Sequence, residues 1–433
     1  MSRESFKRRT KTAWPGAALI LLIGLGVLFG CGRNAPAGGV EITVVSPFHS
    51  EDGNRSNYVR AYQAYEAATG NTVADESAPS NEDWKVKVLT DFDEGREPDV
   101  LFYFTGADAD RLVRSGKVVS ISDVQKAYPD FAANMKSSMM PVSTANGRQY
   151  AVPVNGYWEG MFVNTKVLAD CGLALPGEDY TWEGFLSDCQ TILEQGYIPV
   201  ACSLAEVPHY WFEFCVFNNG SIADHLVLPA ASGDATGRKW AAGLLDIKEL
   251  YDKGYLPENT TEAPDSEINL LMTDNKAAFM IDGSWKVGWF QSNAADIGDF
   301  AVAYVPAKGE RKPTDILGGL SMGYYITKKA WDDPAKREAC VSFVRAMTTD
   351  EVVSSFGALS VTALVNGTQA PENADPLETS ALAMTKNCTG IVGVAQDLLI
   401  PTARNSLFAD IPGVVTGSLT PEEAIDRCLA IRH

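Results

Sequence analysis

The chain has 433 residues, a formal net charge of −19 and a hydrophobic content of 45%. This length allows two domains of ordinary size with substantial cores. The acidic charge argues against nucleic acid or an anionic lipid surface as a partner, because both select for basic patches.

The first residues are typical of an export signal. Five basic residues precede a run of thirteen apolar or glycine residues, 17–29. This run is shorter than the ~20 apolar residues that span a bilayer, which predicts a secretory signal peptide over residues 1–30. It ends in Leu-Phe-Gly-Cys and resembles a bacterial lipoprotein processing site, although Phe29 stands where a small residue is usual. The resemblance implies a lipid on Cys31; the alternative is an ordinary signal or an uncleaved anchor with a chance cysteine.

The segment 31–40 joins this cysteine to the fold and is expected to be a flexible tether, because it has no apolar periodicity. Removal of residues 1–30 leaves 403 residues with 31 basic and 54 acidic side chains, a net charge of −23. Such a chain stays soluble and is repelled by the membrane that holds it. We expect a monomer that is lipid-anchored at the extracellular or periplasmic face of the cell membrane.

Seven cysteines follow Cys31. Their number is odd and they form no Cys-x-x-Cys pair, so a complete disulfide framework is impossible. Most lie in apolar runs, where a cysteine packs as a small hydrophobic residue. We expect buried free thiols, with a bridge between Cys171 and Cys189 as an open alternative.

Short strands alternate with amphipathic helices along the mature chain, each bounded by glycine, proline or a capping residue. We expect strands at 42–45, 100–104, 198–201, 277–281, 300–305 and 320–327. We expect helices at 56–69, 181–193, 240–250 and 334–347, and a last helix from 420 onward. This alternation predicts an α/β fold with two domains.

The surrounding sequence does not support a catalytic site or a metal-binding site. Residues 319–323 match Gly-x-Ser-x-Gly, which would make Ser321 the nucleophile of a secreted esterase. That motif requires a strand-to-helix turn followed by an acid and a histidine, whereas a strand is predicted here and only His433 follows. The four histidines have no metal-ligand spacing. We expect no enzyme activity, no cofactor and no metal.

Three segments, 95–103, 147–164 and 277–285, resemble the extracellular solute-binding proteins of ABC importers, family 1, the group that includes maltodextrin binders. The order of these landmarks covers nearly the whole mature chain. The resemblance implies a two-lobe, periplasmic-binding-protein-like α/β fold with an interlobe ligand cleft and hinge crossings. It also implies a receptor that delivers a solute to a membrane permease.

By this resemblance, the first lobe takes residues 41–153 plus 314–360, and the second takes 154–313 plus 361–433. Crossings between the lobes are expected at 153–164 and 317–327. Strand ends and glycines at such junctions can absorb a hinge rotation.

A carbohydrate, either a mono- or an oligosaccharide, is the expected ligand. A sugar presents hydroxyl groups to polar side chains and C–H faces to aromatic rings, so its site combines both. In the second lobe, the residues expected to contact it are Tyr157, Trp158, His209, Tyr210, Glu213, Asp282 and Trp285. Trp285 matches the family's cleft tryptophan. Residues 208–213 match a second-lobe loop of the family, in which His209 departs from the usual aromatic residue. Each of these aromatic residues has the alternative of packing in the core.

The first lobe and the late part of the chain contribute further positions. Ser46 and Asp108 follow predicted strands and Tyr103 lies at the end of one, and doubly wound sheets place ligands beyond the carboxyl ends of strands. Asp108 could instead cap the following helix. Arg404 lies where the family returns a segment to the cleft, with a surface salt bridge as its alternative. Two other functions stay open, a receptor for a non-sugar solute such as a peptide or polyamine, and an adhesion lipoprotein without a small ligand.

The change Cys31→Ser should release the protein from membranes, because it removes the thiol to which the lipid attaches. Fractionation after a salt wash tests this expectation. Cys31→Ser protein that still sediments with membranes would place the anchor elsewhere.

Overall fold

The computed structural model describes residues 39–50, 52–357, 360–366 and 373–431. The expected signal peptide, Cys31 and nearly all of the tether lie outside these residues. Among the helices that are described, none combines the length and the apolar character needed to cross a membrane.

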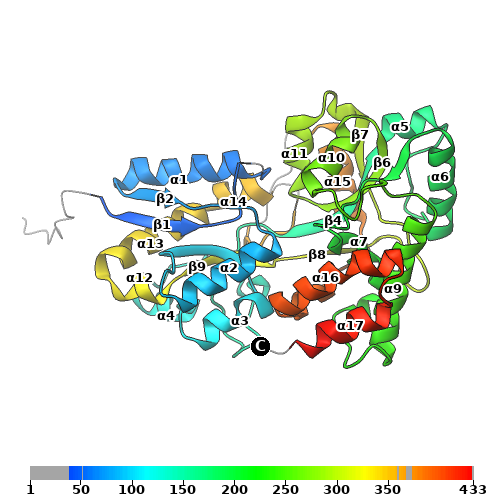
Figure 1. Cartoon of the computed structure of the whole chain (residues 1–433). Helices are drawn as coiled ribbons and strands as arrows, with labels where there is room; N and C mark the ends of the chain where they lie inside the picture. Colours follow the sequence, from blue (N-terminus) through cyan, green and yellow to red (C-terminus); the bar gives the residue numbers. More distant parts are fainter. Residues whose placement is uncertain (1–38, 51, 358–359, 367–372, 432–433) are drawn as a thin grey trace, which may run out of the picture. The chain divides into compact units, whose positions relative to one another are not determined.

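A four-stranded sheet forms the core of the first lobe, in the order β2 (Thr72–Asp75), β1 (Glu41–Val45), β3 (Val100–Phe104) and β9 (Met322–Ile326). β1 runs parallel to β2 and β3, whereas β9 is antiparallel to β3. The sheet is covered on both faces (Figure 1). One face packs against α1 (Arg55–Thr69) and α13 (Pro334–Met347), and the other against α2 (Glu82–Asp93) and α3 (Ala107–Arg114).

The second sheet has the order β10 (Gly390–Val392), β8 (Asp315–Gly319), β4 (Tyr157–Asn164), β6 (Ala277–Gly283) and β5 (Ile198–Val200), with β7 (Phe300–Ala303) also paired to β4. All eight residues of β4 are buried because helices cover both faces. On one face lie α6 (Trp182–Glu194), α7 (His209–Asn218), α9 (Ala235–Asp252), α16 (Pro401–Thr416) and α17 (Pro421–Ala430). On the other lie α10 (Asp265–Thr273), α11 (Lys286–Asn293) and α15 (Pro376–Asn387).

The remaining helices are short or connect these layers. They are α4 (Ile121–Ala127), α5 (Thr165–Asp170), α8 (Ile222–His225), α12 (Lys328–Asp332), α14 (Asp350–Gly357) and the 3-10 turns η1 (Ser137–Met139), η2 (Ile297–Asp299) and η3 (Ala395–Leu398).

The chain passes between the two sheets before β4, between β8 and β9, and between α14 and α15. The lobe boundaries themselves stay a prediction. However, the expected boundary at residue 314 leaves β8 in the first lobe, whereas β8 pairs with β4 and β10 in the second sheet. Strand pairing therefore favours a boundary between β8 and β9.

Local sequence signals explain most element ends. Helix α1 ends at Gly70, whose φ of +74° is left-handed and suits glycine. Helix α6 begins after Thr181, whose side chain accepts a hydrogen bond from the Gly184 amide. The expected loop at residues 208–213 was wrong, because helix α7 starts at His209. Every residue of α7 from Trp211 to Asn218 is buried, so it shows no amphipathic period.

The cysteines agree with the expectation of free thiols. All seven that the structure describes are free, including Cys171 and Cys189, and five of them are buried.

The buried side chain of Arg311 organises the loop between β7 and β8. It is 3% exposed and donates hydrogen bonds to the carbonyl oxygens of Val305 (2.7 Å), Pro306 (2.8 Å) and Asp315 (2.9 Å). Arg311→Leu leaves these acceptors unpaired, so we expect the free energy of unfolding to fall by ~3 kcal/mol.

Urea denaturation of this variant against Lys312→Leu tests the prediction. Lys312 is the exposed neighbour of Arg311, so its substitution should change stability little. Equal losses for the two variants would contradict a structural role for Arg311.

Candidate functional site

An open hollow of about 460 Å³ lies where β1 and β2 end. Its volume is in the range of small-molecule sites. It lies beyond the carboxyl ends of parallel strands, where α/β sheets place ligands. Its lining residues are His49, Ser50, Arg55, Asp75, Ser77, Ala78 and Pro79.

The polar side chains around this hollow are held in place by an ion pair and hydrogen bonds within the protein. Arg55 Nη1 lies 2.6 Å from Asp75 Oδ2 and donates to the Phe48 carbonyl oxygen at 2.8 Å. Ser46 Oγ lies 2.6 Å from Ser77 Oγ and is fully buried. Ser46 therefore supports the wall from behind rather than facing the hollow.

The loop that borders this hollow touches the turn after β6. A Cβ atom on Gly53 would lie 2.6 Å from the Trp285 carbonyl oxygen and 3.1 Å from Gly288 Cα. Only glycine allows the two backbones to approach so closely. This contact places the backbone of Trp285, in the second lobe, against the loop that borders the hollow.

Aromatic side chains from β4, α7 and α16 gather around Trp285. Its ring centroid lies 6.1 Å from that of Tyr157 at the start of β4 and 5.9 Å from that of Tyr210 in α7. His209 lies 4.1 Å from Tyr210 and stacks on Phe408 of α16 at 5.5 Å. Four of the predicted site residues thus form one cluster, which we call the aromatic cluster together with Phe408.

Arg404 joins the two lobes through a buried ion network. Its side chain is 0% exposed and comes from α16 of the second lobe. Nε lies 2.8 Å from Glu82 Oε2 and Nη2 lies 2.5 Å from Asp108 Oδ1, both in the first lobe. Nη1 lies 3.2 Å from Asp397 Oδ1. Arg404 and Asp108 were both predicted as ligand contacts, and each is paired with the other. The surface salt bridge that was the alternative for Arg404 is instead a buried one.

A second cation completes this network. Lys85 Nζ lies 2.6 Å from Glu82 Oε1 and 3.6 Å from Asp108 Oδ2. Burial raises the pKa of Asp397 to about 6, against the lowering effect of the Arg404 and Lys85 charges. The network therefore holds carboxylates from both lobes around two cations.

Two of the predicted contacts, Trp158 and Tyr103, are buried and packed against neighbouring side chains. Trp158 points to the opposite face of β4 from Tyr157, is 1% exposed and stacks on Phe162 at 6.0 Å. Tyr103 is 0% exposed and donates to the Lys85 carbonyl oxygen at 3.2 Å.

The two predicted acidic contacts of the second lobe are also paired. Glu213 accepts hydrogen bonds from the amides of Ala395 (2.9 Å) and Gln396 (2.6 Å) and lies 3.1 Å from His225 Nε2. Asp282 Oδ2 lies 3.1 Å from Lys286 Nζ. Their charges are therefore satisfied within the protein.

Sequence reasoning missed Glu82, Lys85, Asp397 and Phe408. A helix start with Glu82 and Lys85 three residues apart is typical of an exposed, charged helix surface. Nothing local indicates a partner such as Arg404, which is 322 residues away from Glu82.

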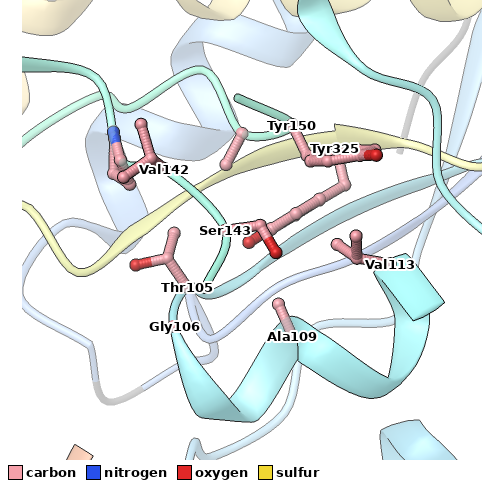
Figure 2. Close-up of a pocket in the computed structure, with 10 residues that line it drawn as sticks. Thr105, Gly106, Ala109, Val113, Val142, Ser143, Tyr150 and Tyr325 are labelled. Atoms are coloured by element: carbon pink, nitrogen blue, oxygen red, sulfur yellow. The ribbon is translucent and has the colours of Figure 1, made fainter. Parts of the chain in front are cut away.

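A second cavity, beside α3, is too small for a solute. It has a volume of about 10 Å³, which is close to the space of a single water molecule. Figure 2 shows Thr105, Ala109, Val142 and Tyr150 around it. Among the described residues, no group of His, Cys, Asp and Glu side chains is placed to hold a metal ion.

Residues 60–385 match the family model of the bacterial extracellular solute-binding proteins. A comparison with curated proteins finds no match.

Solved structures show the same fold. A chitin oligosaccharide binding protein has a TM-score of 0.78 and 20% identity, covering 90% of this chain and 97% of its own. RafE in complex with raffinose has a TM-score of 0.72 and 17% identity, covering 90% and 98%. The GacH receptor of Streptomyces glaucescens, solved unliganded and with acarbose, has a TM-score of 0.67 and 16% identity, covering 90% and 97%. These similarities confirm the predicted two-lobe α/β fold.

The stability of the protein should depend on the protonation of His209. Burial, reinforced by the charges of Lys85 and Arg404, lowers its pKa from 6.5 to about 3. Below pH 6.5 the unfolded chain therefore binds a proton that the folded protein does not, and stability falls as the pH decreases toward 3. At pH 5 this difference amounts to at most about 2 kcal/mol.

Thermal unfolding of His209→Phe at pH 7.5 and pH 5.0 tests this effect. The variant should lose less stability than the wild type on acidification, because it has no histidine to protonate at this position. An identical loss in both proteins would show that His209 is protonated in the folded state.

Proposed function

We propose that this chain, which belongs to the family of bacterial extracellular solute-binding proteins, captures a carbohydrate and delivers it to the permease of an ABC importer. The observation that carries this proposal is the aromatic cluster beside the polar hollow of the first lobe. A sugar needs both surfaces, since its C–H faces pack on rings and its hydroxyl groups bond to polar side chains. Solved structures of similar fold include receptors for chitin oligosaccharides and raffinose, which supports the same ligand class.

In this proposal, Trp285, Tyr157 and Tyr210 form the apolar wall, with His209 at its edge. The polar groups of Arg55 and Asp75 lie in the hollow across the Gly53–Gly288 contact. A ligand held between these surfaces contacts both lobes at once. Because such a ligand binds more tightly when the lobes are together, it stabilises that form of the protein.

The receptor acts without chemistry on its ligand. Ser321 lies between strands β8 and β9 rather than at a strand-to-helix turn, and its carbonyl oxygen accepts a hydrogen bond from the Thr105 amide at 2.7 Å. This arrangement does not support the esterase alternative.

The mature protein is proposed to be a monomer held at the outer face of the cell membrane by a lipid on Cys31. The sequence of residues 1–40 supports this location, and the family's extracellular character agrees with it. A tether between the anchor and the fold would let the receptor reach its permease.

A thermal-shift screen of the mature protein against mono- and oligosaccharides should identify the ligand, and calorimetry should then measure its affinity. Trp285→Ala should weaken binding by about 1–3 kcal/mol, or roughly ten- to a hundredfold, because an aromatic wall is lost. The melting temperature of the ligand-free protein should change little.

Trp289→Ala is the matched control, since Trp289 is also partly buried but packs with the α11 face of the second sheet. It should leave the affinity unchanged. A large loss of stability with unaltered affinity in Trp285→Ala would assign Trp285 to the core. Absence of binding to any saccharide would contradict the proposed ligand class.

A further inference from the structure

Glu159 lies in the middle of the proposed ligand wall. It is two residues after Tyr157 on β4, so both side chains point to the same face of the sheet. Its partner across the antiparallel pair with β6 is Gly283. A Cβ atom on Gly283 would lie 2.2 Å from Trp285 Cη2, so the indole occupies the space above that glycine. Because directly opposed residues point to one face, the Trp285 ring lies beside the Glu159 side chain.

The carboxyl group of Glu159 lacks a counter-charge. Its side chain belongs to a residue that is 2% exposed, and Oε2 has no hydrogen-bond partner among the described residues. A buried polar oxygen without a partner is costly, and native proteins pair such groups. The orphaned oxygen therefore points to a group that the ligand supplies.

The cations of this region are engaged elsewhere. Lys286 Nζ lies 3.1 Å from Asp282 and 3.5 Å from Asp265. Arg404 and Lys85 are shared among the carboxylates of the ion network described above. The Glu213 carboxylate is satisfied by two backbone amides and His225.

The charged groups that act on Glu159 are all acidic. They are Glu213 of α7, Asp397 of η3 and Asp282 of β6. Burial and these three charges hold the pKa of Glu159 well above its ordinary value. Both effects favour the protonated form of the carboxyl group, whereas a positive ligand group would favour its ionised form.

Aromatic rings next to a carboxylate are a suitable environment for a cation. The faces of Trp285, Tyr157 and Tyr210 carry negative electrostatic potential, which attracts an ammonium group. The carboxylate supplies the opposite charge and a charge-assisted hydrogen bond. A neutral hydroxyl group gains much less from the same surroundings.

We propose that Glu159 recognises a protonated amine on the ligand, so that this receptor selects an amino sugar over its neutral analogue. This inference rests on the proposed function as a carbohydrate receptor and specifies the class of carbohydrate. When the ligand binds as its ammonium form, Glu159 releases its own proton to the solvent and pairs with the ammonium group.

Three matched series of β-1,4-linked oligosaccharides of two to four units test the proposal: cello-, chito- and chitosan oligosaccharides, which carry hydroxyl, acetamido and amino groups at C2. The wild type should bind the amino series at least about tenfold more tightly than either neutral series. Glu159→Gln should lose this preference while it keeps its affinity for the neutral sugars. Glu183→Gln, which removes the same charge from an exposed position on α6, should keep the preference.

Calorimetry of the wild type in two buffers of different ionisation enthalpy provides a test without a variant. At a pH below the pKa of the ligand's amine, binding of the amino sugar should release protons from Glu159, and binding of a neutral sugar should release none. Equal affinity for the three series, or no proton release, would overturn the role of Glu159 while leaving the carbohydrate receptor intact. Spermidine bound through Glu159, with no saccharide bound, would instead overturn the proposed function.

Discussion

The arrangement of the two lobes depends on the ion pairs of the buried Arg404 guanidinium group. It comes from the second lobe and is shared by carboxylates of both lobes, with Lys85 as a second cation in the same network. Burial of so many charges is favourable only when their geometry is good and every donor is used. The network therefore fixes α16 against α2 and α3. Because α16 also carries Phe408, the same constraint positions His209 and, through it, Tyr210 beside Trp285.

This network also determines the electrostatic character of the site. Acidic side chains outnumber basic ones throughout the mature chain, and the interior between the lobes repeats that imbalance. The available cations are fully occupied by Glu82, Asp108, Asp397, Asp265 and Asp282. Glu159 is left with a raised pKa next to three aromatic rings. Solubility of the protein and the proposed selection of a positively charged ligand group both fit this acidic composition.

Local patterns were sufficient to predict the α/β alternation and many element ends. Glycines such as Gly70 end helices because of their backbone freedom, and an apolar run such as that of β3 marks a buried strand. The helix α7 was missed because it is buried all round and lacks the amphipathic period on which prediction depends.

Local patterns also identified some of the residues that gather at the candidate site, but not their contacts. Trp285, Tyr157, His209 and Tyr210 were identified by residue type and resemblance, and the structure brings them together. The twofold periodicity of a strand separates Tyr157 from Trp158, and only the packing of both faces shows which one meets Trp285. The ion pair between Arg404 and Asp108 joins residues 296 positions apart, so no local pattern reveals it.

Small-angle scattering of the ligand-free protein tests the central claim, that the Arg404 network holds the two lobes together. The account predicts a larger radius of gyration for Arg404→Met than for the wild type, with an unchanged far-ultraviolet circular dichroism spectrum, because the lobes separate while each keeps its fold. An unchanged radius of gyration in a folded Arg404→Met protein would contradict this claim.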